Sequence, residues 1–171
     1  MDAIKLLEIH LQAAHWIFDT TTADVTEESA HKGPVGTAGT VGSQMAHLVY
    51  DEDMIVNGIL LGKAPLSATT FAGKTGISDP QMAIAPEWPK KLRLNVTEFR
   101  AYQKAVFAAT DSYLASLKET DLDRELDMTS MGMGMQNVGW AFGMLIIGHA
   151  NNLAGEISAL KGAQGMKGYP F

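Results

Sequence analysis

Four stretches of the chain repeat apolar residues at three- and four-residue steps, which is the period of an amphipathic helix. Segments rich in Gly, Pro, Ser and Thr separate these stretches, and no convincing strand-like alternation stands out. The pattern predicts an all-α protein, a four-helix bundle with long inter-helix connections, in a single domain over residues 1–171. We expect helices over about residues 2–20, 41 or 43 to 61, 94–117 and 137–161, and one extra turn at residues 26–29.

Two connections between these expected helices are unusual. Residues 62–92 carry repeated Pro and Gly, and a connection of that length often covers a cavity or an active site. Residues 128–135, with the sequence MTSMGMGM, form a second irregular connection. Its thioethers suit Cu(I), although Met more often lines an adaptable apolar surface. A third loop is expected over residues 33–39, which contain Gly33, Pro34, Gly36 and Gly39.

Composition excludes several classes of function. Thirteen Lys and Arg against nineteen Asp and Glu give a net charge of −6, which argues against binding to nucleic acid or an anionic membrane. The absence of Cys removes disulfides, thiolate nucleophiles and Cys-based metal sites, so a metal needs His, carboxylate, amide, Met or water ligands. The first ten residues lack a signal-peptide pattern, and residues 138–148 are too short to span a bilayer. We therefore expect a cytoplasmic protein.

Two histidines lie in the middle of apolar helices, each followed by polar side chains on the same face. Asp51 follows His47 by one turn, and Asn152 and Glu156 follow His149 at three and seven residues. If the second and fourth helices face each other, these side chains can converge inside the bundle and hold a metal ion. The alternative is that each histidine is a single hydrogen-bonded residue of the core or of a cleft, because no compact motif such as HExxH is present.

The same residues carry a resemblance to a known family. The segments AHLVYDED (residues 46–53) and HANNLAGEISALKGAQGMKGYPF (residues 149–171) resemble the second and fourth helices of the DinB-like superfamily, which includes the YfiT-like proteins. This resemblance implies a four-helix bundle in which three histidines bind a divalent metal such as zinc or nickel. His47 and His149 match the first two ligands. Leu153 stands at the third position, so Asp51 or Glu156 would have to complete the site.

Family members with an assigned activity are thiol S-transferases and isomerases that use a low-molecular-weight thiol. The resemblance therefore implies a metal-dependent enzyme, such as a thiol S-transferase or a hydrolase, acting on a small molecule. The alternative is a non-catalytic bundle that binds a small apolar ligand or a protein partner at a degraded metal cleft. The wide apolar helix faces also make a homodimer plausible. We expect the protein to bind neither nucleic acid nor a membrane.

Overall fold

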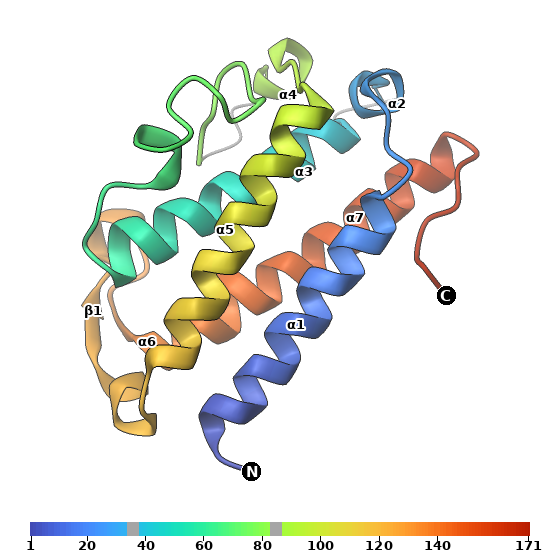
Figure 1. The fold of residues 1–171 in the computed structure, drawn as a ribbon. Helices are drawn as coiled ribbons and strands as arrows, with labels where there is room; N and C mark the ends of the chain where they lie inside the picture. Colours follow the sequence, from blue (N-terminus) through green and yellow to red (C-terminus); the bar gives the residue numbers. More distant parts are fainter. Residues whose placement is uncertain (34–37, 83–86) are drawn as a thin grey trace.

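The computed structural model describes residues 1–33, 38–82 and 87–171, and these residues are mostly helical (Figure 1). Helix α1 packs against α5 and α7, and α3 packs against the same two helices, so the long helices enclose one core. Phe18, Val49, Tyr102 and Ile157 all lie fully buried in it. The long helical segments are α1 (Ala3–Thr22), α3 (Val41–Asp53) continued by η1 (Met54–Leu60), α5 (Val96–Ser116), and η5 (Ala141–Gly148) continued by α7 (His149–Ala163).

Capping residues explain where the helices begin. Asp2, Thr40 and Asn95 each accept a hydrogen bond from a backbone N–H in the first turn of α1, α3 and α5. Asn137 does the same for the short helix α6 (Val138–Trp140), which leads into η5. These are short polar side chains placed directly before apolar periodic stretches. They are a principal reason why the predicted and observed helix starts agree to within a few residues.

Both helices that carry the predicted site histidines change from α to π geometry close to them. On one helix, η1 begins at Met54, directly after the last α-helical turn of α3. On the other, η5 ends at Gly148, directly before His149. A π-helix adds a residue to each turn and turns the following side chains relative to an ideal α-helix. The facing direction of residues after such a segment cannot be calculated from α-helical spacing alone.

Short helical elements fill the connections among the described residues. Helix α2 (Glu27–His31) confirms the extra turn predicted after Thr26, because the side chains of Thr26 and Ser29 cap each other's backbone. The loop predicted at residues 33–39 lies partly outside the described residues, since residues 34–37 are not described. The remaining short helices are η2 (Leu66–Ala68), α4 (Trp88–Lys91), η3 (Glu119–Asp123) and η4 (Thr129–Met131).

The expectation that the chain has no strands is wrong at one place. Strands β1 (Glu125–Asp127) and β2 (Met135–Asn137) pair antiparallel around the Met/Gly run, with Leu126 opposite Gln136. Gly132 and Gly134 have positive φ values, which allow the tight return of the chain. Each strand is three residues long, too short for an alternating pattern to be visible in the sequence.

Asp53 fastens the long connection after η1 to the core. Its fully buried carboxylate accepts hydrogen bonds of 2.8 Å from the backbone N–H groups of Leu66 and Ser67, and one of 2.7 Å from the Tyr102 hydroxyl. Further along, Gly76 has a φ of +73°, and an added Cβ would meet the backbone of Asn95 and Phe99 at 2.5 Å. The connection thus packs on α3 and α5, apart from residues 83–86, which are not described.

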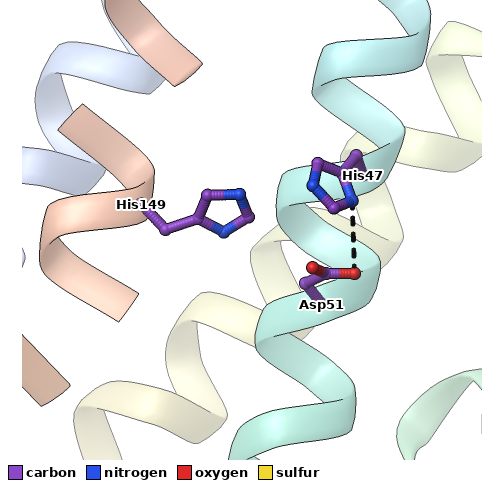
Figure 2. A group of neighbouring side chains, drawn as sticks. All are labelled: His47, Asp51 and His149. Atoms are coloured by element: carbon purple, nitrogen blue, oxygen red, sulfur yellow. Dashed lines mark ion pairs between the residues drawn. The ribbon is translucent and has the colours of Figure 1, made fainter. Parts of the chain in front are cut away.

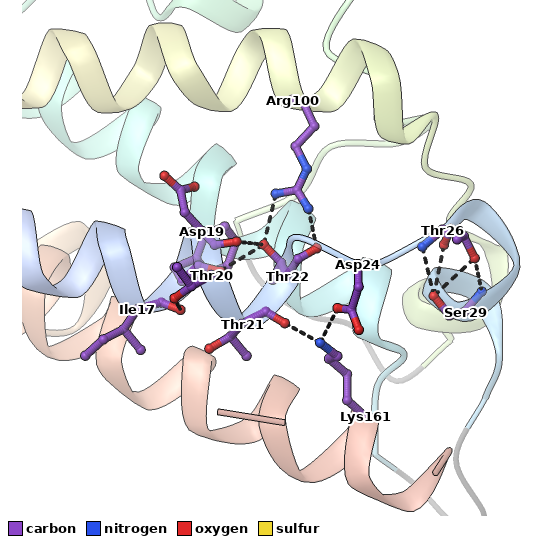
Figure 3. A network of polar contacts seen from close by, with 11 residues as sticks. Ile17, Asp19, Thr20, Thr21, Thr22, Asp24, Thr26, Ser29, Arg100 and Lys161 are labelled. Atoms are coloured by element: carbon purple, nitrogen blue, oxygen red, sulfur yellow. Dashed lines mark hydrogen bonds and ion pairs between the residues drawn. The ribbon is translucent and has the colours of Figure 1, made fainter. Parts of the chain in front are cut away.

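A polar network at the end of α1 joins three long helices (Figure 3). The Lys161 ammonium group, on α7 and almost completely buried, donates to the Thr21 carbonyl oxygen and the Asp24 carboxylate. Arg100, on α5, donates to the hydroxyl and the carbonyl oxygen of Thr22. These contacts satisfy carbonyl groups that the end of a helix leaves free. Within the part of the chain that the structure describes, no helix is both long enough and apolar enough to cross a bilayer.

Candidate metal centre

The structure brings His47, Asp51 and His149 together between α3 and α7. Each offers one potential ligand atom, and these three atoms lie within 4.8 Å of one another. Figure 2 shows the His149 ring reaching from α7 towards the two side chains on α3. The centroids of the two imidazole rings are 4.9 Å apart, and the rings are nearly perpendicular. The predicted convergence of the second and fourth helices at these residues therefore occurs.

Two buried atoms of this group have no hydrogen-bond partner among the described residues. His47 Nδ1 and Asp51 Oδ1 are 3.3 Å apart, but their orientation does not form a hydrogen bond. Leaving such buried polar atoms unpaired costs about 1–3 kcal/mol each. Two ligands of a tetrahedral ion with bonds of ~2.0–2.1 Å stand about 3.3–3.4 Å apart. The spacing and the missing partners thus fit a shared divalent cation.

The electrostatic environment keeps His149 in the form that can bind a metal. Burial, together with the nearby His47 ring, lowers the pKa of His149 to about 4. Its imidazole is therefore neutral at pH 7 and retains a free lone pair. Burial raises the pKa of Asp51, and the contact with His47 opposes that shift. A cation in this position would favour the ionised carboxylate.

Other residues considered from the sequence lie outside this group. Glu156, on α7, accepts a hydrogen bond of 2.7 Å from Gln44 and is exposed. Asn152 is also exposed, and Leu153, which holds the position of the family's third histidine, is 4% exposed in the apolar core. Of the two carboxylates that could complete the ligand set, Asp51 is the one that the fold places beside both histidines.

A second buried pair escaped the sequence analysis. Glu52, next to Asp51, accepts a hydrogen bond of 3.1 Å from His15 Nε2 and one of 2.5 Å from the Thr110 hydroxyl. The sequence did show Glu52 as a single carboxylate on the apolar face of its helix. A carboxylate in such a place requires buried hydrogen-bond partners. Nothing in the spacing of the sequence identifies His15, on α1, as one of those partners.

Comparison with known proteins places the chain in a family. The sequence model of the DinB superfamily matches residues 10–154. Among proteins with curated descriptions, none matches this chain. A crystal structure of a conserved protein from Enterococcus faecalis is similar over 95% of this chain and 97% of that chain, with 22% sequence identity and a TM-score of 0.80. Identity at that level shows a shared fold and no more. Because the family match covers most of its length, the chain belongs to the DinB superfamily.

Proposed function

We propose that this protein binds one divalent cation, zinc or nickel, through His47, Asp51 and His149. The observation that carries this proposal is the pair of buried, unpartnered atoms, His47 Nδ1 and Asp51 Oδ1, beside a neutral His149. A set of two histidines and one carboxylate is a common ligand set of catalytic zinc sites, which leave one coordination position to water or substrate. Leu153 provides no fourth protein ligand, and this favours an open site over a closed structural one.

The activity proposed for this site is that of a thiol S-transferase, in which a low-molecular-weight thiol attacks an electrophilic substrate. Hydrolysis is the alternative reaction. A bound divalent cation lowers the pKa of a coordinated thiol or water, so that the nucleophile exists at neutral pH. The chain contains no Cys, so the sulfur must belong to the small-molecule substrate. His47, Asp51 and His149 would hold the ion, and the ion would supply that nucleophile. Membership of the DinB superfamily supports this proposal, because metal binding is frequent among its members.

A second candidate function is a non-catalytic bundle that binds a small apolar ligand or a protein partner in a degraded metal cleft. Leu153 favours it, because an apolar side chain stands where relatives carry the third imidazole. The finer assignments made from the sequence remain part of the proposal. These are a four-helix bundle built from α1, α3–η1, α5 and η5–α7, a cytoplasmic location, and association as a homodimer.

Elemental analysis of protein purified without a His tag or chelator tests the metal site. We expect about one zinc or nickel per chain, lost in His47→Ala and retained in His10→Ala, which removes an exposed histidine of α1 as a matched control. Leu153→His should tighten binding by adding a third imidazole. A wild-type protein that stays empty after incubation with these ions would contradict the metal site and leave the non-catalytic function. Thiol-dependent transfer assays follow only for a metal-loaded protein.

A further inference from the structure

A cavity lies between α1 and α5, whereas the candidate metal centre lies between α3 and α7. The cavity has a volume of about 430 Å³, and the side chains that line it include His15, Lys104, Phe107 and Asp111. None of these belongs to the His47, Asp51 and His149 group. The cavity therefore requires an explanation that does not depend on the proposed metal.

The His15 ring is fixed in one orientation at the wall of this cavity. Its Nε2 atom lies 3.1 Å and 3.3 Å from the two carboxylate oxygens of Glu52. One face stacks on the Phe107 ring, with 3.7 Å between centroids and 4° between planes. The side chain is only 8% exposed, so it has lost the freedom of a surface histidine. A ring held by a carboxylate behind it presents its other nitrogen in a defined direction.

That other nitrogen, Nδ1, forms no hydrogen bond with any described residue. The nearest carboxylate oxygen, Asp111 Oδ1, is 3.9 Å away, which is beyond hydrogen-bond distance. While Nε2 carries the proton shared with Glu52, Nδ1 of the neutral ring is an acceptor, and Asp111 is an acceptor beside it. A donor with a positive charge, such as an ammonium group, satisfies both atoms at once.

The other end of the cavity has the opposite charge. Lys104 precedes Asp111 by seven residues on α5, which places their Cα atoms about 10 Å apart along the helix axis. Lys104 is exposed, and its ammonium group forms no ion pair with the described residues. Phe107 lies between these two ends and provides an apolar floor. Asp19 and Arg100, also in the wall, are already engaged by Gln103 and Thr22.

We propose that this cavity binds a small ω-amino acid, with its ammonium group between His15 Nδ1 and Asp111 and its carboxylate at Lys104. The distance between the Lys104 ammonium group and the Asp111 carboxylate selects the ligand by its length as well as by its charges. The methylene groups of the ligand lie over Phe107. Binding of an ammonium group excludes the proton on Nδ1, so the ligand binds only to the neutral form of His15. Although burial opposes protonation of this ring, Glu52, Asp111 and Asp19 together raise its pKa, so the affinity should increase as the pH rises through the folded-state value.

Titration of the full-length protein with 5-aminopentanoate tests this proposal, monitored by calorimetry and by NMR of the histidine rings at a pH where the His15 ring is neutral in its own NMR titration. Pentylamine and pentanoate are the matched controls, because each retains one of the two charges. We expect saturable binding of 5-aminopentanoate, at least tenfold tighter than either control, together with a shift of the His15 resonances. Equal binding of pentylamine would overturn the proposed role of Lys104. Absence of binding by all three compounds would overturn the site.

Substitutions at the two exposed ends separate binding from folding. Asp111→Asn and Lys104→Gln should each weaken binding of 5-aminopentanoate at least tenfold, while thermal unfolding stays close to that of the wild type. Asp123→Asn and Lys63→Gln make the same changes at exposed positions outside the cavity and should leave the affinity unchanged. His47→Ala should also bind the amino acid normally. Loss of binding in that variant would contradict the independence of the two sites.

Discussion

Two neighbouring residues of α3 each pair with a histidine, and the two pairs differ in a useful way. Glu52 meets His15, 37 residues away in the sequence, in a closed arrangement that also includes the Thr110 hydroxyl. Asp51 meets His47 on the same helix, and the facing atoms of this pair remain without hydrogen bonds. The Glu52–His15 pair is buried, and the side chains of the His47–Asp51 pair are only slightly more exposed, at 14% and 12%.

The two pairs differ in how the ring meets the carboxylate. Side chains four residues apart lie beside each other on one face, but the His47 ring does not direct an N–H at the Asp51 carboxylate. A partner from another helix approaches with more freedom, as His15 does. The closed pair, Glu52 and His15, therefore stabilises the fold. The open pair, Asp51 and His47, keeps two atoms that can still bind a metal, and His149 faces these atoms from α7. The contact between Glu52 and His15 Nε2 is structural and leaves only His15 Nδ1 for a ligand, whereas both facing atoms of the second pair belong to the candidate metal centre.

The largest expected effect comes from removing the carboxylate of the closed pair. Glu52→Ala should lower the free energy of unfolding by about 3–5 kcal/mol, because it leaves His15 and Thr110 buried without their shared acceptor. Urea unfolding at pH 7 without added metal measures this change. Asp51→Ala is the matched variant and should cost less than about 1 kcal/mol, since its carboxylate has an unpartnered oxygen already. Equal losses in both variants would show that the two pairs do not differ as described.

The histidine of the closed pair, His15, and the histidine that faces the open pair, His149, should also respond to pH in opposite directions. His149, with a pKa of about 4 in the folded protein and 6.5 as the reference value, binds its proton more readily when unfolded. Its contribution to stability falls as the pH drops from about 6.5 to 4, by up to about 3 kcal/mol. Unfolding of the metal-free protein across this range, compared with His149→Gln, measures the effect. A variant with an unchanged pH slope would contradict it.

The sign is reversed for His15. Burial opposes protonation of this ring, but Glu52, through its charge and its hydrogen bond, and the more distant Asp111 and Asp19 outweigh burial and raise the pKa of His15. The stabilisation from this raised pKa is complete below pH 6.5 and is lost as the pH rises through the folded-state value. The wild type should therefore lose stability as the pH rises above 6.5, and His15→Gln should abolish this loss, whereas His149→Gln acts below pH 6.5.

Metal binding provides a third way to distinguish the pairs. Zinc at one hundred times its dissociation constant should stabilise the wild type by about 2.7 kcal/mol. Thermal unfolding with and without zinc measures this increase, which should disappear in Asp51→Asn. Glu52→Gln should be less stable at the outset but should retain the increase on adding zinc. If zinc stabilises Asp51→Asn as much as the wild type, the ion does not bind between His47 and Asp51.

Sequence periodicity predicted the long helices well, because each combines a sustained apolar stripe with a capping side chain such as Asn95. It also predicted that His47, Asp51 and His149 could converge, and the fold brings these three together. Asn152 and Glu156, which were expected to join them, are exposed and lie outside the group. The hairpin around Gly132 was missed because its strands are too short to show a period. The His15–Glu52 pair was missed because it depends on how α1 approaches α3, which local spacing does not encode.

The smallest expected effect concerns the carboxylate that the fold leaves outside the metal group. Glu156→Gln should change zinc affinity by less than about twofold and stability by less than about 1 kcal/mol, because the new amide oxygen can still accept from Gln44. Competition for zinc against a chelator of known affinity measures the first quantity. A large loss of affinity would mean that α7 moves on metal binding and replaces Asp51 with Glu156. Under that outcome the open pair on α3 would be a resting arrangement, and Asp51→Asn would retain most of the zinc affinity.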